Sequence, residues 1–288
     1  MEQKSVKSLE GKNALQMAFS EGYQFNLSDF ALFMSVMKVK EAYENVLSII
    51  LDEADLRLME VKAEQVILNK SGKRAIRLDA WAQDVRGRQF DMEMQNDSDS
   101  DDIRRRARFY QGLLDTPVLK AGKSTRYKYL PSTVIIFITQ EDIFERDSAI
   151  YTFSEWCEEV EGLPLGDGTK KIFLNMSCFN GREELVSLLQ YMKNTTLGNP
   201  DIIVKDKRIE ELDRIVKEVK QSEEWEAVKM NILEIGLKQG IEQGMAKSLV
   251  KNVESAMKNF GIDLQRACEG LGTTVEEYEQ AKEKDINN

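Results

Sequence analysis

The sequence of 288 residues contains no histidine, and this is its most informative absence. Without histidine the chain cannot form a Ser-His-Asp triad, a Cys-His pair or a histidine-ligated zinc site. Any chemistry must therefore use carboxylates, amides, lysine, tyrosine or a metal ion that prefers oxygen ligands. Cysteine is scarce as well. Cys157, Cys178 and Cys268 lie far apart and are odd in number, which argues against a disulfide framework or a zinc knuckle.

Long apolar runs and an excess of positive charge are also missing. The longest apolar run that resembles a strand, Val134–Ile138, is too short to span a bilayer, and residues 1–22 lack the apolar core of a signal peptide. We therefore expect a cytoplasmic protein with no membrane role. The net charge of −10 argues against a surface that is basic overall, so any contact with DNA must be local.

The remaining pattern is typical of an α/β protein. Apolar residues at spacings close to three and four predict helices over Asp29–Leu51, from Ile103 to about Leu114, and over Glu183–Asn194. The continuous apolar run in Thr133–Thr139 predicts a strand that is covered on both faces and paired in parallel. Lys171–Asn175 looks like one more strand.

Two segments that alternate between apolar and polar residues predict an antiparallel hairpin. Asp79 lies on the polar face of the first, Ala75–Ala82, and Asp91, Glu93 and Gln95 lie on the polar face of the second. If both apolar faces cover one core, Asp79 must lie opposite Glu93 or Gln95. From alternation alone, the simplest interpretation of this polar row is a solvated sheet face.

The compact pattern ends at Gly198-Asn-Pro200, and the composition beyond it is helical. We therefore predict a domain over residues 1–200 and a helical C-terminal extension over residues 201–288, with a role in oligomerisation or regulation. Gly236, Gly240 and Gly244 resemble a close helix-packing motif, which makes the extension a candidate contact for a homo-oligomer.

Five stretches occur in an order that matches one known group of enzymes. They are Arg77-Leu-Asp79, Phe90-Asp-Met-Glu93-Met-Gln95, Arg105-Arg-Ala-Arg-Phe-Tyr-Gln-Gly112, Ile150-Tyr-Thr-Phe153 and Leu165-Gly-Asp-Gly-Thr-Lys-Lys-Ile-Phe-Leu-Asn175. The set covers roughly residues 25–195 and resembles the PD-(D/E)XK nucleases, more sharply their Rpn-type recombination-promoting nuclease and transposase family. The resemblance implies a restriction-endonuclease-like α-β-β-β-α-β core with a mixed sheet.

The resemblance also implies a DNA endonuclease that depends on Mg²⁺, with Mn²⁺ as a substitute, and acts in recombination. Asp79 and Glu93 would be metal ligands together with the backbone carbonyl of Met94, and Gln95 stands where the superfamily's motif lysine usually stands. An amide can neither carry the charge of a lysine nor accept a proton as a lysine with a lowered pKa can, so cleavage would lean more heavily on the metal.

Further residues are candidates around this site. Glu41 or Glu44 on the first helix would add a carboxylate, and the sequence does not choose between them. The segment from Ile103 to Lys128 contains eight basic residues and one acid, the local charge that a phosphate backbone favours.

Arg105, Arg108 and Gln111 recur every third residue along the predicted helix and are candidate DNA contacts, whereas Tyr110 is expected in the core. The alternative to a nuclease is a non-cleaving module. It would bind nucleic acid or a protein through the basic helix and the C-terminal helices.

Overall fold

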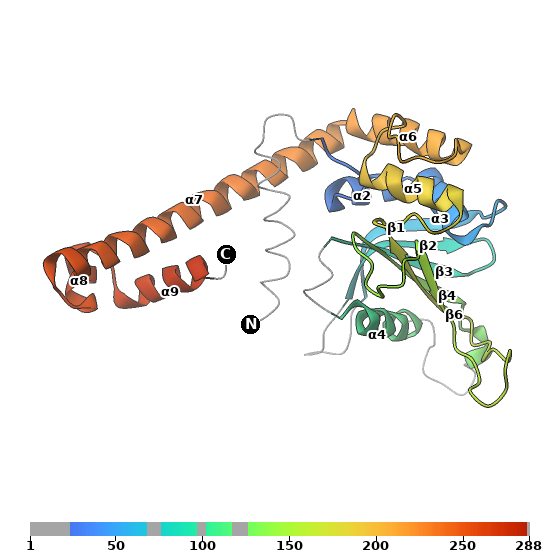
Figure 1. Cartoon of the computed structure of the whole chain (residues 1–288), viewed down its shortest axis with the longest axis horizontal. Helices are drawn as coiled ribbons and strands as arrows, with labels where there is room; N and C mark the ends of the chain where they lie inside the picture. Colours follow the sequence, from blue (N-terminus) through green and yellow to red (C-terminus); the bar gives the residue numbers. More distant parts are fainter. Residues whose placement is uncertain (1–23, 68–75, 97–101, 117–125, 287–288) are drawn as a thin grey trace. The chain divides into compact units, whose positions relative to one another are not determined.

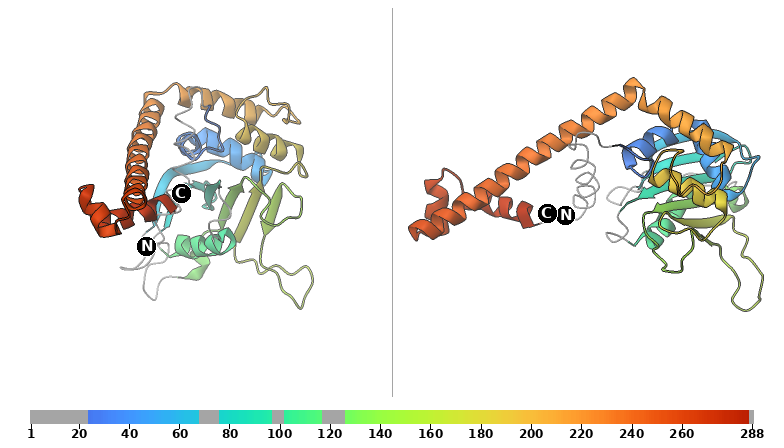
Figure 2. Two further views of the ribbon diagram at one scale, coloured as in Figure 1. Left: turned by 60° about the vertical axis from the view of Figure 1, so that its left-hand side comes forward. Right: turned by 45° about the horizontal axis from the view of Figure 1, so that its top comes forward.

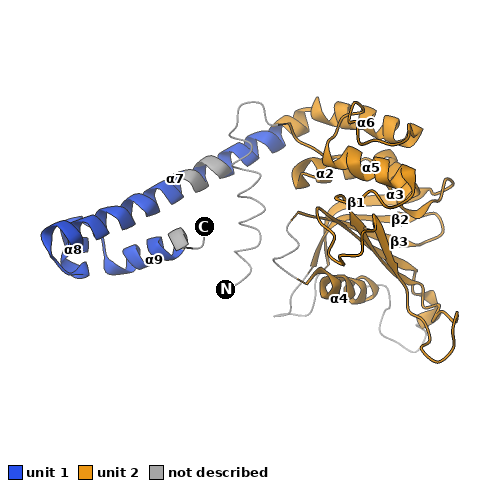
Figure 3. Cartoon of the chain, viewed as in Figure 1, with its two compact units in different colours: residues 1–23, 227–288 blue, residues 24–226 orange. Residues whose placement is uncertain are grey.

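The computed structural model describes residues 24–67, 76–96, 102–116 and 126–286. The chain divides into two compact units, which are treated separately below (Figure 3). Residues 24–226 form the sheet unit, and the described residues from 227 onwards belong to the helical unit. The predicted boundary at residue 200 lies before α6 (Lys207–Lys220), which packs on α3 (Lys40–Leu51) within the sheet unit. The expectation for residues 1–22 and the first residue of the predicted hairpin, Ala75, lie outside the described residues.

Within the described residues, the sheet unit contains a mixed sheet of six strands in the order β1-β2-β3-β4-β6-β5. The strands are β1 (Leu58–Ile67), β2 (Ile76–Asp84), β3 (Gln89–Gln95), β4 (Thr133–Thr139), β5 (Ile150–Phe153) and β6 (Thr169–Asn175). The first three are antiparallel, β4 lies parallel between β3 and β6, and β5 pairs antiparallel with β6. The predicted burial and parallel pairing of Thr133–Thr139 are therefore confirmed.

Helices cover both faces of the sheet (Figures 1 and 2). One face carries α2 (Phe30–Met37), α3, α5 (Glu183–Lys193) and α6, and the other carries α4 (Ile103–Asp115). The order α3-β1-β2-β3-α4-β4 is the predicted α-β-β-β-α-β core, so the predicted fold class is confirmed.

The prediction of one helix over Asp29–Leu51 is wrong, because α2 ends at Met37 and α3 begins at Lys40. Val39 adopts an extended conformation, with φ −80° and ψ 114°. Its N–H closes a short turn onto the Val36 carbonyl, while its own carbonyl accepts the Tyr43 N–H as the next helix begins. No glycine or proline marks the break, and the apolar spacing continues across it because both helices bury side chains.

The turn between β2 and β3 fixes the register of the hairpin. Gly87 has a φ of +81°, a conformation that is easy for glycine and rare for other residues. The Asp84 carboxylate accepts the N–H groups of Arg86 and Arg88 at 3.0 and 2.8 Å. Arg88 also binds both oxygens of Glu53, which ties the turn to the segment after α3.

The helical unit contains the greater part of α7 (Glu223–Phe260) together with α8 (Leu264–Gly270) and α9 (Val275–Ile286). A small apolar cluster, which includes Val253, Cys268 and Tyr278, holds these helices together. A Cβ atom added at Gly244 would meet no neighbouring heavy atom within 4 Å. The surroundings of Gly236 and Gly240 lie outside what the structure describes. None of the described helices has the combination of length and hydropathy that crossing a membrane requires.

Candidate active site

The polar row of the hairpin is buried beneath α4, so it is not a solvated sheet face. Asp91 and Glu93 have no exposed surface, Gln95 is 2% exposed and Asp79 is 8% exposed. The same face carries apolar side chains that pack with α4, among them Phe137 of β4, which lies beside Glu93 in the parallel register. Burial of three carboxyl groups needs compensation from hydrogen bonds or charge.

The register of β2 and β3 brings two of the predicted site residues together. Ala80 lies opposite Met92, which places Asp79 beside Glu93. The backbone N–H of Asp79 donates to Glu93 Oε1 at 2.8 Å. Of the two partners that the sequence allowed for Asp79, the structure therefore selects Glu93. Met94 lies between Glu93 and Gln95 on β3, in register with Ile138 of β4.

The charge on this row is met by Arg106, which the sequence analysis did not single out. Arg106 Nη2 donates to Glu93 Oε2 at 2.6 Å, and Nη1 donates to Gln95 Oε1 at 2.8 Å. The Nε of Arg106 donates to the Tyr110 hydroxyl at 2.9 Å. One arginine thus joins an acid and an amide of β3 to an aromatic residue of its own helix.

The local sequence explains why Arg106 turns inward. Asp102 caps α4 by accepting the N–H groups of Arg104 and Arg105, which fixes the first turn. Arg106 lies four residues before Tyr110, so the two side chains share one side of the helix. This spacing from a predicted core residue was the available signal for Arg106. The expectation that Tyr110 belongs to the core is confirmed, since it is buried against Phe137.

The three candidate DNA contacts on α4 do not share one face. Arg105 and Arg108 are exposed. Gln111 is buried, and its amide donates to the Thr133 carbonyl at 3.3 Å and also contacts the Thr133 hydroxyl. In this arrangement only the two arginines are accessible to a polyanion. Part of the basic segment Ile103–Lys128 lies outside the described residues.

Asp91 is a second residue that the candidate site had left out. Among the described residues, no donor reaches either oxygen of its buried carboxyl group. Burial raises the pKa of Asp91 well above its usual range, and the charges of Glu93 and Asp79 raise it further. Two ionised carboxylates offer only acceptors, so a proton held by this pair allows Asp91 and Glu93 to share a hydrogen bond. Its place in the same alternating row as Glu93 was the signal that could have found it.

The other ionisable groups of the site respond to the same two effects. Burial raises the pKa of Glu93, although the charge of Arg106 acts in the opposite direction. Burial lowers the pKa of Arg106, but the charges of Glu93, Tyr110 and Asp79 and the hydrogen bond to Tyr110 together outweigh this effect and leave the pKa raised. Arg106 therefore stays charged in the site. Burial also raises the pKa of Tyr110, and Glu93 adds to that effect.

Comparison with protein families assigns the sheet unit to a known family. The family model for the PD-(D/E)XK nuclease family transposase matches residues 29–234, a region that contains the whole polar row and α4. The chain belongs to this family. No curated protein and no solved structure gives a significant match to it. Membership in a PD-(D/E)XK nuclease family supports a nuclease-like function for the sheet unit.

The candidate acids on the first predicted helix have other partners in this PD-(D/E)XK domain. Glu44 Oε1 accepts the backbone N–H of Leu58 at 2.7 Å, at the start of β1. Glu41 lies 3.6 Å from Arg214 of α6. Both carboxylates therefore serve the packing of α3 against its neighbours.

The PD-(D/E)XK family implies a divalent metal, and the side chains of the row fit one. Three side chains of the row carry carboxyl groups, those of Asp79, Asp91 and Glu93, and Gln95 offers an amide oxygen. Oxygen ligands of this kind are the ones that Mg²⁺ prefers. Arg106 already places a positive charge against two of them. Among the described residues, no three acidic or sulfur side chains converge closely enough to enclose an ion. Asp79 and Glu93 offer two carboxylates, and Mg²⁺ commonly keeps several waters in place of further protein ligands.

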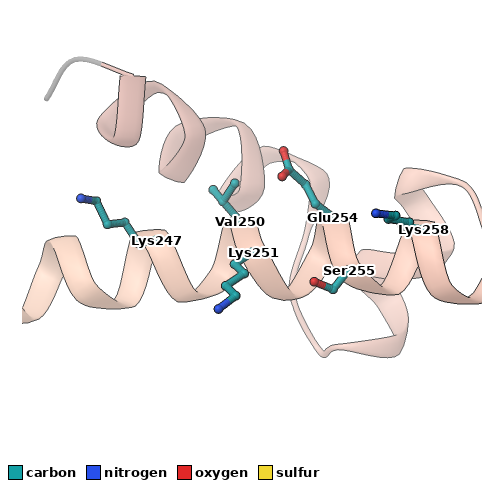
Figure 4. Close-up of a pocket in the computed structure, with 6 residues that line it drawn as sticks. All are labelled: Lys247, Val250, Lys251, Glu254, Ser255 and Lys258. Atoms are coloured by element: carbon teal, nitrogen blue, oxygen red, sulfur yellow. The ribbon is translucent and has the colours of Figure 1, made fainter.

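A shallow hollow lies on α7 of the helical unit (Figure 4). It is lined by Lys247, Val250, Lys251, Glu254, Ser255 and Lys258. Glu254 at its edge is engaged with Tyr278 and Lys282 of α9. The hollow shares no residue with the polar row, so the candidate active site rests on the hairpin and α4.

Proposed function

We propose that this PD-(D/E)XK family member is a Mg²⁺-dependent DNA endonuclease that acts in recombination. The observation that carries the proposal is the hydrogen bond from the Asp79 backbone N–H to the Glu93 carboxylate. It lies within a buried polar row, in a domain of the nuclease family. A buried row of carboxyl groups destabilises a fold unless a cation or protons balance it. Its presence under α4 is therefore best explained by the chemistry that it performs.

In this proposal Asp79 and Glu93 hold the ion, and the backbone carbonyl of Met94 joins them. Mg²⁺, or Mn²⁺ in its place, supplies positive charge that stabilises the negative charge developing on the phosphate. Gln95 donates and accepts hydrogen bonds, which suits an amide that orients the attacking water or a phosphate oxygen. Asp91 lies in the same buried row, two residues before Glu93 on β3.

The reaction is hydrolysis of a phosphodiester. The oxygen of water forms a bond to phosphorus, and one phosphorus–oxygen ester bond breaks. One proton of the water goes to the departing hydroxyl group, and the other stays with the new phosphate monoester or passes to solvent. The exposed Arg105 and Arg108 bind the backbone of the DNA, which explains how a protein with a net charge of −10 meets a polyanion locally.

The test is nicking and linearisation of supercoiled plasmid by the full-length protein with Mg²⁺ or Mn²⁺, and with chelator. Asp79→Asn and Glu93→Gln remove the charges while keeping the shapes, and we expect both to abolish cleavage. Glu41→Gln is the matched control, because this acid contacts Arg214 of α6, and it should cleave like wild type. Cleavage that survives Asp79→Asn and Glu93→Gln, or that ignores chelator, would contradict the proposed site.

The salt bridge between Arg106 and Glu93 favours one other candidate function, a non-cleaving DNA-binding module in which the arginine permanently neutralises the row. Under that alternative the wild-type protein binds DNA, leaves it intact in every metal, and binds as tightly after Asp79→Asn as before. The same set of proteins in a filter-binding assay therefore separates the two functions.

A further inference from the structure

Arg106 is the partly exposed partner of the fully buried Glu93 carboxylate. Its guanidinium binds Glu93 and Gln95 at once and lies 5.4 Å from the centre of the Phe137 ring. The Arg106 side chain is 22% exposed, whereas the Glu93 side chain has no exposed surface. Of these two partners, Arg106 is therefore the one that a phosphate from solvent can reach.

On the basis of the proposed nuclease activity, we propose that Arg106 is a catalytic residue which contacts the scissile phosphate and supplies the positive charge that Gln95 lacks. An amide can bind a phosphate oxygen but brings no net charge. A guanidinium remains charged, and its planar set of N–H donors matches two phosphate oxygens at once. Its hydrogen bond to Gln95 holds this charge beside the amide.

In the same geometry Arg106 should weaken the binding of the ion. Glu93 Oε2 accepts a hydrogen bond from Arg106 Nη2, so a divalent cation held by Glu93 must share or displace that contact and meets repulsion from the guanidinium. Loss of Arg106 should therefore help ion binding while it harms cleavage. An arginine with a purely structural role would instead impair both together.

The first experiment compares wild type with Arg106→Met in the full-length protein. Titration calorimetry with Mn²⁺ and no DNA should show binding that is tighter by roughly two- to fivefold, the size expected for removal of one partly exposed charge interaction. Plasmid cleavage by the same preparation should slow by about 10²- to 10³-fold, as when one donor to a transition-state charge is removed. Arg104→Met, an exposed arginine of the same helix, is the matched control and should leave Mn²⁺ affinity unchanged.

The second experiment moves the charge rather than removing it. In the Arg106→Met background, Gln95→Lys returns a cation to the adjacent position on β3. We expect this double variant to cleave at least about tenfold faster than Arg106→Met alone, since one well-placed charge contributes more than that to such a transition state. Arg106→Lys should give an intermediate rate, because it keeps the charge and loses the two-pronged geometry.

The outcomes separate this inference from the function on which it rests. If wild type cleaves and Arg106→Met cleaves equally well, the role of Arg106 is overturned while the nuclease proposal survives. Mn²⁺ affinity that stays the same or weakens in Arg106→Met also overturns the inference. If wild type does not cleave with any metal, the nuclease proposal falls and the catalytic role of Arg106 falls with it. Circular dichroism checks folding, and Arg106→Gln replaces Arg106→Met in both experiments if the latter does not fold.

Discussion

The two faces of β3 are equally buried and opposite in chemistry. Phe90, Met92 and Met94 point to one face, and Asp91, Glu93 and Gln95 point to the other. The apolar face needs nothing but close packing. The polar face needs a partly buried arginine, and even so Asp91 can hydrogen-bond to Glu93 only when the pair holds a proton. Burial alone therefore does not distinguish core from site; the demand for compensating charge does.

The largest effect on stability should come from removing a side chain of the apolar face. Phe90→Ala removes a fully buried ring and should lower the free energy of unfolding by about 3–5 kcal/mol, through lost contacts and the cavity left behind. Urea denaturation followed by circular dichroism measures this change. Phe179→Ala, at an exposed ring, is the control and should change stability far less. A small loss at Phe90 would show that this face is not the main source of stability.

On the polar face the sign of the effect should reverse. Asp91→Asn should raise the free energy of unfolding by about 1–3 kcal/mol at about pH 8, because it removes a buried acid whose ionisation is opposed by burial and by the charges of Glu93 and Asp79. Since the pKa of Asp91 is raised by burial, the folded state binds more protons than the unfolded chain above about pH 4, and stability falls as pH rises through that window.

Thermal unfolding across a pH series tests this prediction. The difference between wild type and Asp91→Asn should grow with pH, whereas Asp201→Asn, at an exposed acid, should run parallel to wild type. A wild type that becomes more stable relative to Asp91→Asn as pH rises would contradict the assigned burial cost.

A smaller effect on stability is expected from the hydrogen bond that joins α3 to the backbone of β2. The Tyr43 hydroxyl of α3 donates to the Ala80 carbonyl of β2 at 2.6 Å. Tyr43→Phe keeps the ring and should cost about 1 kcal/mol, the usual net contribution of one such hydrogen bond. Chemical denaturation measures it. A loss as large as that of Phe90→Ala would mean that this bond also holds the sheet in register.

The smallest effect on stability is expected on the outer side of α4. Arg105 is largely exposed, and its ion pair within the described residues is with the partly exposed Asp102 in the first turn, so Arg105→Ala should leave the unfolding midpoint unchanged. If Arg105 contacts a phosphate as proposed, the slope of log DNA affinity against log salt concentration should fall by about one. An unchanged slope would remove Arg105 from the DNA surface.

The hairpin shows what the sequence can predict. Alternation of apolar and polar residues has a period of two, so it assigned Asp79, Asp91, Glu93 and Gln95 to one face. The requirement that both apolar faces cover one core narrowed the partner of Asp79 to Glu93 or Gln95. The register itself depends on how Asp84 and Gly87 close the turn. The same pattern could not say that α4 would cover the polar row, because that depends on a helix that follows it in the chain.

Helix faces were harder to predict. Arg104, Arg105, Arg106 and Arg108 are chemically alike, and only the docking of α4 decides which of them meets Glu93. Gln111 shares a spacing of three with Arg105 and Arg108, yet a helix has 3.6 residues per turn, so the row drifts and Gln111 ends against Thr133. The break between α2 and α3 had no local signal, since both helices continue the same apolar spacing.

The polar row and its arginine come from one continuous stretch of chain, between Asp79 and Arg106. The parallel strands β4 and β6 and the helices on the far face provide only the frame against which this stretch folds. Substitutions within this one short segment can therefore alter the charge of the row without touching the segments that build the frame.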